Sequence, residues 1–233
     1  MGTDIHCWVE KRGEGKRWVL VQPQKGDAGW DEYWAKDDSP RRRASWDIGR
    51  NYNTFAILAD VRNGFGFAGV DTGDGFKPIL TLHDDGVDNP HRRGWPKDVC
   101  QELAHEDVDH SPNWLTLREL NEYDWQQVTK SRGVVTLDQY QKWVKEGREG
   151  RPDRWCGGIS GPNIEVLSME EADERLASGL LPGLKETHVR IEWRVTYAEA
   201  SGFYKRHLPS LNEVAKREGV SPDDLRLVFY FDS

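Results

Sequence analysis

The sequence is poor in cysteine, contains no long apolar run and lacks an excess of positive charge. Its three cysteines lie far apart and follow no zinc-ligand spacing, which is typical of a reducing cytosol rather than of a disulfide framework. No apolar run approaches the roughly 20 residues that span a bilayer, and the N-terminus lacks the apolar segment of a secretory signal. The formal net charge of −8 argues against a general nucleic-acid-binding surface and against binding to anionic membranes. We therefore expect a cytosolic protein that binds neither nucleic acid nor membrane.

Tryptophan, in contrast, is abundant in a chain that is otherwise polar. The 233 residues include 11 tryptophans. Some of these rings belong in a core, and amphipathic rings beyond that need suit ligand pockets and protein interfaces. A chain of this length forms one large domain or two small ones, with enough residues to bury a substantial core.

Alternating apolar and polar residues predict strands at both ends of the chain. The pattern covers residues 4–11 and 17–22 at the start, and 188–197 and 225–231 near the end. Short helices and long loops fill the interval. Because terminal strands that meet in one sheet make one unit, we expect a single α+β domain over residues 1–233, with a mostly antiparallel sheet built from the N- and C-terminal strands.

Helix-start signals lie between these strands. Thr116, Thr136 and Ser168 are each followed three residues later by Glu or Gln, which predicts the start of a helix at each position. Pro96 suits the first position of a helix that runs to about His105.

Residues 23–49 have little periodicity and contain prolines, aspartates and an arginine run. Loops of this length are usually functional or disordered. The aromatic residues in the segment favour an ordered flap. Whether this flap at 23–49 is a lid or an interface stays open at the level of sequence.

The stretch from residue 50 to residue 76 joins the most apolar helix candidate to a glycine-rich loop. Asn53 suits the N-cap of the helix, and Gly64 suits its end. The glycines that follow allow the backbone to turn and to present N–H groups to a ligand. A second glycine-rich loop covers residues 154–163. We expect residues 50–76 to form the floor of a binding site.

Arginines and aromatic residues accompany this stretch, and together they suit a nucleotide. A base stacks on an aromatic ring, while guanidinium and backbone N–H groups hold phosphates. The predicted ligand-binding residues are Trp8, Arg50, Tyr52, Arg62, Gly73, Gly75 and Trp114.

The first strand supports an alternative. Asp4 and His6 are two residues apart, so their side chains share a strand face and suit two ligands of one divalent metal. His110 would complete the metal site, and Asp109 would act as a base. Further candidate ligands include His83 and Asp84. In the competing structural interpretation, Asp4 pairs locally and His6 is a partly buried histidine.

Six sequence blocks carry a family resemblance: MGTDIHCWVE at the start, RNYNTFAILADVRNGFGFAG at 50–69, TGDGF at 72–76, HSPNWLTLREL at 110–120, WCGGISG at 155–161 and RLVFYFD at 226–232. Together they resemble a family of uncharacterised proteins from tailed bacteriophages, over nearly the full length. The chain has Asn53 where members usually have Asp, and Pro112 where they tend to have a second histidine. The missing histidine argues against a histidine-rich metal centre.

By analogy with other phage accessory proteins, the resemblance implies an anti-defence protein in the host cytoplasm. We expect it to bind and sequester a nucleotide-derived immune signal, such as a cyclic dinucleotide, as a homo-oligomer without a cofactor. One alternative is a metal-dependent phosphodiesterase that cleaves the signal, with Asp4, His6, Asp109 and His110 as catalytic residues. Another is an inhibitor that binds a host defence protein through the flap at 23–49.

Overall fold

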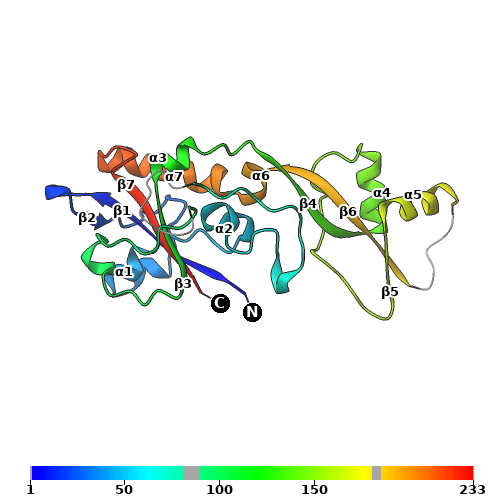
Figure 1. The fold of residues 1–233 in the computed structure, drawn as a ribbon, viewed down its shortest axis with the longest axis horizontal. Coiled ribbons are helices and arrows are strands. Elements are labelled where there is room, and N and C mark those ends of the chain that lie inside the picture. The colour runs from blue at the N-terminus through cyan, green and yellow to red at the C-terminus, as the bar shows by residue number, and fades with distance from the viewer. Residues whose placement is uncertain (1, 81–89, 180–184, 233) are drawn as a thin grey trace.

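The computed structural model describes residues 2–80, 90–179 and 185–232 (Figure 1). Its first sheet has the strand order β2-β1-β7-β3, and every neighbouring pair is antiparallel. The strands are β1 (Asp4–Arg12), β2 (Trp18–Leu20), β3 (His110–Thr116) and β7 (Leu225–Asp232). The predicted α+β fold, with a mostly antiparallel sheet built from N- and C-terminal strands, is confirmed.

A second sheet, which the sequence patterns did not reveal, has the order β4-β6-β5 and lies beside the first along the long axis of the molecule (Figure 1). The predicted strand at 188–197 belongs to this sheet. Here β6 pairs antiparallel with β4 and parallel with β5. The strands are β4 (Val128–Thr136), β5 (Ile164–Leu167) and β6 (Glu186–Thr196). Helices α4 (Leu137–Lys145) and α5 (Met169–Ala177) contribute to a small core of their own with this sheet.

Both faces of the first sheet are buried. Cys7 and Val9 pack in the main core, together with residues of α2 (Tyr52–Ala59), α3 (Leu117–Glu122), α6 (Tyr197–Ser201) and α7 (Phe203–Glu218). Trp8 and Tyr230 point to the other face, where Leu103 packs against them. That residue belongs to the short 3-10 helix η4 (Gln101–Leu103). No helix in the described ranges is long and apolar enough to span a membrane.

The capping signals give the correct helix starts. Thr116 and Ser168 form complete capping boxes, and the Thr136 side chain accepts a hydrogen bond from the Gln139 backbone. Helix α2 is capped by Asn51 rather than by Asn53, because the Asn51 side chain accepts from two backbone N–H groups of the first turn. It also ends earlier than predicted, at Ala59 instead of at Gly64.

The predicted helix from Pro96 to His105 is wrong, since only the three residues of η4 are helical there. Tertiary contacts explain the difference. The backbone N–H of Cys100 donates to the buried Glu10 carboxylate at 2.7 Å. The Asp98 carboxylate accepts from the Arg226 guanidinium at 3.0 Å and from an indole N–H. These partners hold the segment against the first sheet in an irregular conformation.

Residues 23–49 are ordered around two short helices, η2 (Trp34–Lys36) and α1 (Pro40–Arg43). The end of the segment belongs to the core, because Trp46 is only 1% exposed and its backbone N–H donates to the Cys7 carbonyl at 2.8 Å. Tyr33, in contrast, lies on the surface. The remaining 3-10 helices are η1 (Glu14–Lys16) and η3 (Phe67–Gly69).

Candidate ligand-binding site

Both glycine-rich loops pair with the outer edge of β4. In the first loop, Gly73 lies opposite Ser131, and the Arg132 backbone N–H donates to the Thr72 carbonyl at 2.9 Å. In the second loop, Cys156 exchanges two backbone hydrogen bonds with Val134, at 2.8 and 2.9 Å. Because β4 is an edge strand, its unpaired backbone groups bring together two loops that lie far apart in the sequence.

Two glycines make this approach sterically possible. A Cβ on Gly73 would lie 2.1 Å from the Lys130 carbonyl oxygen, and the residue has a φ of +136°, which side chains rarely adopt. A Cβ on Gly133 would lie 2.7 Å from Trp155 Cε3 and 3.1 Å from the Trp193 ring. Glycine at the second position therefore allows the Trp155 ring to lie against β4.

A pocket of about 450 Å³ lies between the two loops, the start of α2 and the second sheet. Its volume falls within the range of small-molecule sites, about 300–1,000 Å³. Four aromatic rings contribute to the wall, namely Tyr52, Phe67, Trp155 and Trp193. Trp155 and Trp193 contact each other edge to face, with ring centroids 5.1 Å apart. We call this space the aromatic pocket.

Exposed apolar side chains gather at the rim of the aromatic pocket. Nine large apolar side chains are exposed among the described residues, and the two glycine-rich loops supply four of them: Phe65, Phe67, Val70 and Trp155. Exposed apolar surface of this kind often marks a binding site. Phe67, Val70 and Trp155 line the pocket itself, which distinguishes it from the rest of the described surface.

Polar groups in the pocket wall have unused hydrogen-bonding capacity. The indole N–H of Trp193, a residue that is 4% exposed, has no acceptor among the described residues. Asn53 donates through its side-chain nitrogen to the Ala200 carbonyl at 3.1 Å, and its side-chain oxygen accepts no bond from the described part of the chain. Arg151 forms no ion pair within the same ranges and carries a positive charge at the pocket.

Three of the predicted ligand residues belong to this region. Tyr52 lines the pocket directly. Gly73 and Gly75 lie in the loop that pairs with β4, where the Gly75 carbonyl accepts a hydrogen bond from Thr129 at 2.7 Å. Arg62 stacks on the Tyr52 ring at 5.2 Å and donates to Thr3 rather than lining the pocket.

The other predicted ligand residues lie apart from the pocket. Arg50 makes a bidentate ion pair with Asp4, in which its Nε lies 2.6 Å from Oδ1. Trp8 is buried, and its indole N–H donates to a backbone carbonyl of α1. Trp114 contacts two guanidinium groups, those of Arg93 at 4.1 Å and Arg226 at 5.1 Å from the ring centroid.

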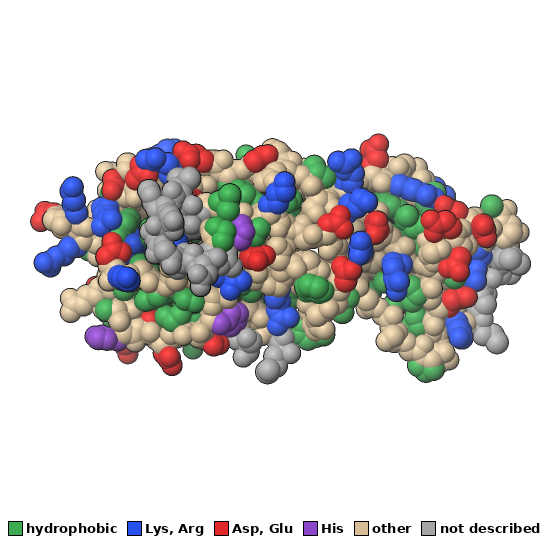
Figure 2. All heavy atoms as spheres, in the orientation of Figure 1, with side chains coloured by type: hydrophobic (Ala, Val, Ile, Leu, Met, Phe, Trp, Pro, Cys, Tyr) green, Lys and Arg blue, Asp and Glu red, His purple; other side chains and the backbone are tan. Residues whose placement is uncertain are grey.

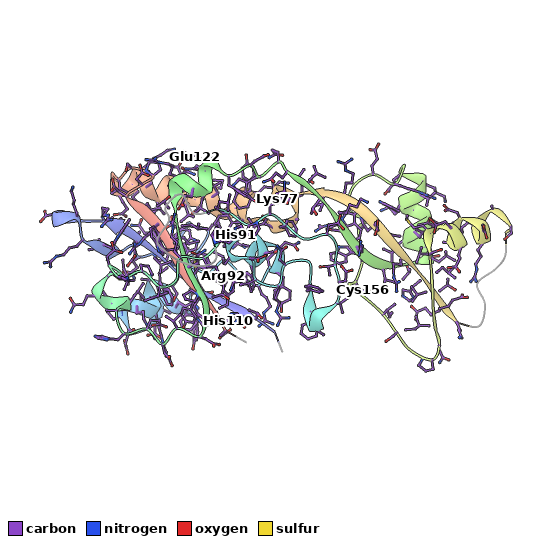
Figure 3. The ribbon with its side chains drawn as sticks, viewed as in Figure 1. Lys77, His91, Arg92, His110, Glu122 and Cys156 are labelled. Carbon is purple, nitrogen blue, oxygen red and sulfur yellow. The ribbon has the colours of Figure 1, made fainter. Side chains whose placement is uncertain are left out.

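The candidate metal ligands lie at one end of the first sheet, where β1 and β3 begin. The Asp4 carboxylate is held by Arg50, and His6 Nε2 lies 3.0 Å from the Asp232 carboxylate. The hydrogen bond from His6 lowers the pKa of Asp232 below its usual value. His110 stacks on the Phe231 ring with centroids 6.0 Å apart. Figure 3 shows His110 well away from Cys156, which marks the second glycine-rich loop.

Asp109 is exposed just before β3. His83 and Asp84 lie outside the described residues. Within the described ranges, no group of three or more His, Cys, Asp or Glu side chains is arranged to hold a metal ion. Of the described residues that line the aromatic pocket, none is Asp, Glu, His or Cys.

The wall residues that were not predicted include the aromatic residues Phe67, Trp155 and Trp193 and the cation Arg151. A signal for three of them was present. Phe67 and Trp155 are aromatic residues within glycine-rich segments, and Arg151 directly precedes the second one. Trp193 had no such signal, because its alternation pattern is that of an ordinary strand residue.

No protein-family model, curated protein or solved structure matches the chain. The fold and the pocket geometry therefore define the candidate site. They describe an α+β protein with an aromatic-walled pocket between the start of α2 and the second sheet.

Proposed function

We propose that the protein binds a small nucleotide-type ligand in the aromatic pocket and holds it without cleaving it. The observation that carries this proposal is the convergence of both glycine-rich loops on one pocket of about 450 Å³ with four aromatic walls. A planar base is the kind of group that such rings bind by stacking, at about 1–3 kcal/mol per base.

The polar groups of the wall complement a nucleotide. The Asn53 side-chain oxygen is an acceptor and suits a donor group on the edge of a base. The guanidinium of Arg151, which forms no ion pair with the described residues, suits a phosphate, because charge-assisted hydrogen bonds of Arg are stronger than neutral ones. One pocket thus combines stacking, edge recognition and a cation.

The pocket supports binding better than hydrolysis. A hydrolase needs a general base or a metal-bound water within reach of the scissile bond. The described wall residues include no carboxylate, imidazole or thiol. The candidate catalytic residues Asp4 and His6 have partners at the first sheet instead, and they do not line this pocket.

The resemblance to tailed-bacteriophage proteins supplies the proposed context. The protein would act in the host cytoplasm as a homo-oligomeric anti-defence factor that sequesters a nucleotide-derived immune signal. In this role, high affinity and slow release matter more than turnover, and no cofactor is required.

Incubation with AMP, cyclic di-AMP and ADP-ribose, followed by removal of free ligand, heat denaturation and mass spectrometry, tests the proposal. We expect at least one intact compound to be released from the wild-type protein. Trp155→Ala should weaken its binding about ten- to a hundredfold, because one stacking surface is lost. Tyr33→Ala, which removes an exposed aromatic residue outside the pocket, is the matched control. Release of a cleaved product would overturn sequestration.

A further inference from the structure

Two asparagines at the start of α2 line the aromatic pocket, and they differ in what they leave for a ligand. The Asn51 side-chain oxygen accepts from the backbone N–H groups of Asn53 and Thr54, at 2.9 and 3.1 Å. Its side-chain nitrogen donates to the carbonyl groups of Ser201 at 2.9 Å and Ala200 at 3.4 Å. The four hydrogen-bonding positions of this amide are therefore all occupied within the protein.

Asn53 uses only one end of its amide. Its side-chain nitrogen donates to the Ala200 carbonyl at 3.1 Å, and because a carbonyl oxygen only accepts, this contact identifies the nitrogen end. Its side-chain oxygen accepts no hydrogen bond from the described residues. Turning the amide over would break the bond to Ala200 and place two oxygen atoms against each other. Asn53 is therefore held so that it presents an oxygen, and not an N–H group, to a ligand.

Among the described wall residues, no other side chain offers a free acceptor that cannot also donate. The hydroxyl groups of Tyr52, Thr72 and Ser131 can donate or accept, and the Arg151 guanidinium only donates. Figure 2 shows acidic and basic side chains interspersed over the end of the molecule that carries the second sheet, whereas Arg151 is the one charged residue of the described pocket wall. Selection among bases therefore depends on the Asn53 oxygen.

An acceptor in the wall distinguishes bases by the group that faces it. The exocyclic amino group of adenine donates a hydrogen bond to such an oxygen. A carbonyl at the same position, as in hypoxanthine or guanine, sets oxygen against oxygen and is disfavoured. A bicyclic base also offers the four aromatic rings of the wall more stacking surface than a pyrimidine does.

We propose that the aromatic pocket selects adenine, and that the Asn53 side-chain oxygen accepts a hydrogen bond from its 6-amino group. This inference rests on the proposed function and deepens it, because it names the base of the nucleotide. The aromatic rings supply stacking that every base shares, and Asn53 is the residue that determines specificity.

Calorimetric titration with AMP, purine riboside 5′-monophosphate and IMP tests this assignment. The second compound lacks the 6-amino group, and IMP carries an oxygen in its place. We expect AMP to bind about tenfold more tightly than either, because only its amino group gives the Asn53 oxygen a partner. Asn53→Ala should reduce both preferences to about twofold or less.

Thr54→Val is the matched control for the loss of a contact between α2 and α6. The Thr54 hydroxyl donates to the Ser201 carbonyl at 2.9 Å, so this variant loses a hydrogen bond of the same kind, and Thr54 does not line the pocket. It should keep the wild-type preference for AMP. If Thr54→Val loses the preference as Asn53→Ala does, the effect comes from the contact between the helices, and the role of the Asn53 oxygen is overturned.

The outcomes separate the two proposals. If none of the three compounds binds the wild-type protein, the nucleotide-binding proposal fails, and the adenine assignment fails with it. If IMP or the purine compound binds as tightly as AMP, the adenine assignment is overturned while nucleotide binding stands. If Asn53→Ala prefers AMP to the wild-type extent, the amino group is recognised elsewhere, and Asn53 does not determine specificity.

Discussion

Replacement of Gly133 by alanine tests the packing that shapes the aromatic pocket. The new Cβ would lie 2.7 Å from Trp155 Cε3, whereas ordinary carbon–carbon contacts are about 3.5–4.0 Å. It would also lie 3.0 Å from the Cys156 carbonyl oxygen. The Trp155 ring and its loop must therefore move by about 1 Å or the strand must shift. Overpacking of this kind costs about 1–3 kcal/mol of folding free energy.

The assay is urea denaturation of Gly133→Ala beside Gly158→Ala. A Cβ on Gly158 would meet Val70 at 3.5 Å, an ordinary contact, so this variant should stay within about 0.5 kcal/mol of wild type. The double variant Gly133→Ala/Trp155→Ala should lose less free energy of unfolding than the sum of the losses in the two single variants, because the clashing ring is absent. If Gly133→Ala keeps wild-type stability, or if the two substitutions add fully, Trp155 does not pack on β4 as described.

Three further predictions concern stability. Gly73→Ala should lower the free energy of unfolding by about 2 kcal/mol or more in urea denaturation. The reason is that the new Cβ would lie 2.1 Å from the Lys130 carbonyl oxygen, at a φ of +136°. A change below about 0.5 kcal/mol would contradict the pairing of this loop with β4. Arg226→Met should cost about 3–5 kcal/mol in the same assay, since it leaves the buried Glu10 carboxylate without its 2.7 Å partner, and wild-type stability would argue against a buried ion pair. Burial lowers the pKa of His207 to about 4, so unfolding, which restores a value near 6.5, takes up a proton. Stability should therefore be full above pH 6.5 and fall by about 3 kcal/mol as the pH drops towards 4, a slope that His207→Gln should lose.

Local sequence signals predicted the elements whose structure depends on neighbouring residues. The capping residues Thr116 and Ser168 mark helix starts correctly because the cap and its partner are three residues apart. Alternation likewise located β1 and β7. These patterns do not show which strands share a sheet, and the second sheet was therefore missed. They also did not show that Trp8, a predicted ligand-binding residue, is buried beneath a neighbouring segment.

The sequence indicated which loop borders the candidate pocket, but it did not indicate most of the residues that line the pocket. The glycine loop at residues 64–75 does border the pocket, as its flexibility suggested. The second glycine-rich loop was also visible in the sequence, but its proximity to the first was not. The structure shows that both loops pair with the same edge of β4. Arg50 looked available for phosphate because its ion pair with Asp4 joins residues 46 positions apart. Long-range pairing of this kind decides which charges remain free, and a single sequence does not contain it.

Modification of Cys156 is the most direct test of nucleotide binding between the glycine-rich loops. This thiol is the exposed one of the three cysteines, whereas Cys7 and Cys100 are buried. It immediately precedes Gly157 in the pocket wall. We would measure its reaction rate with an aromatic disulfide reagent, with and without AMP, cyclic di-AMP or ADP-ribose. The account predicts that a compound that binds slows the reaction in the wild-type protein and has much less effect in Trp155→Ala. An unchanged rate with every compound, or equal protection in both proteins, would contradict it.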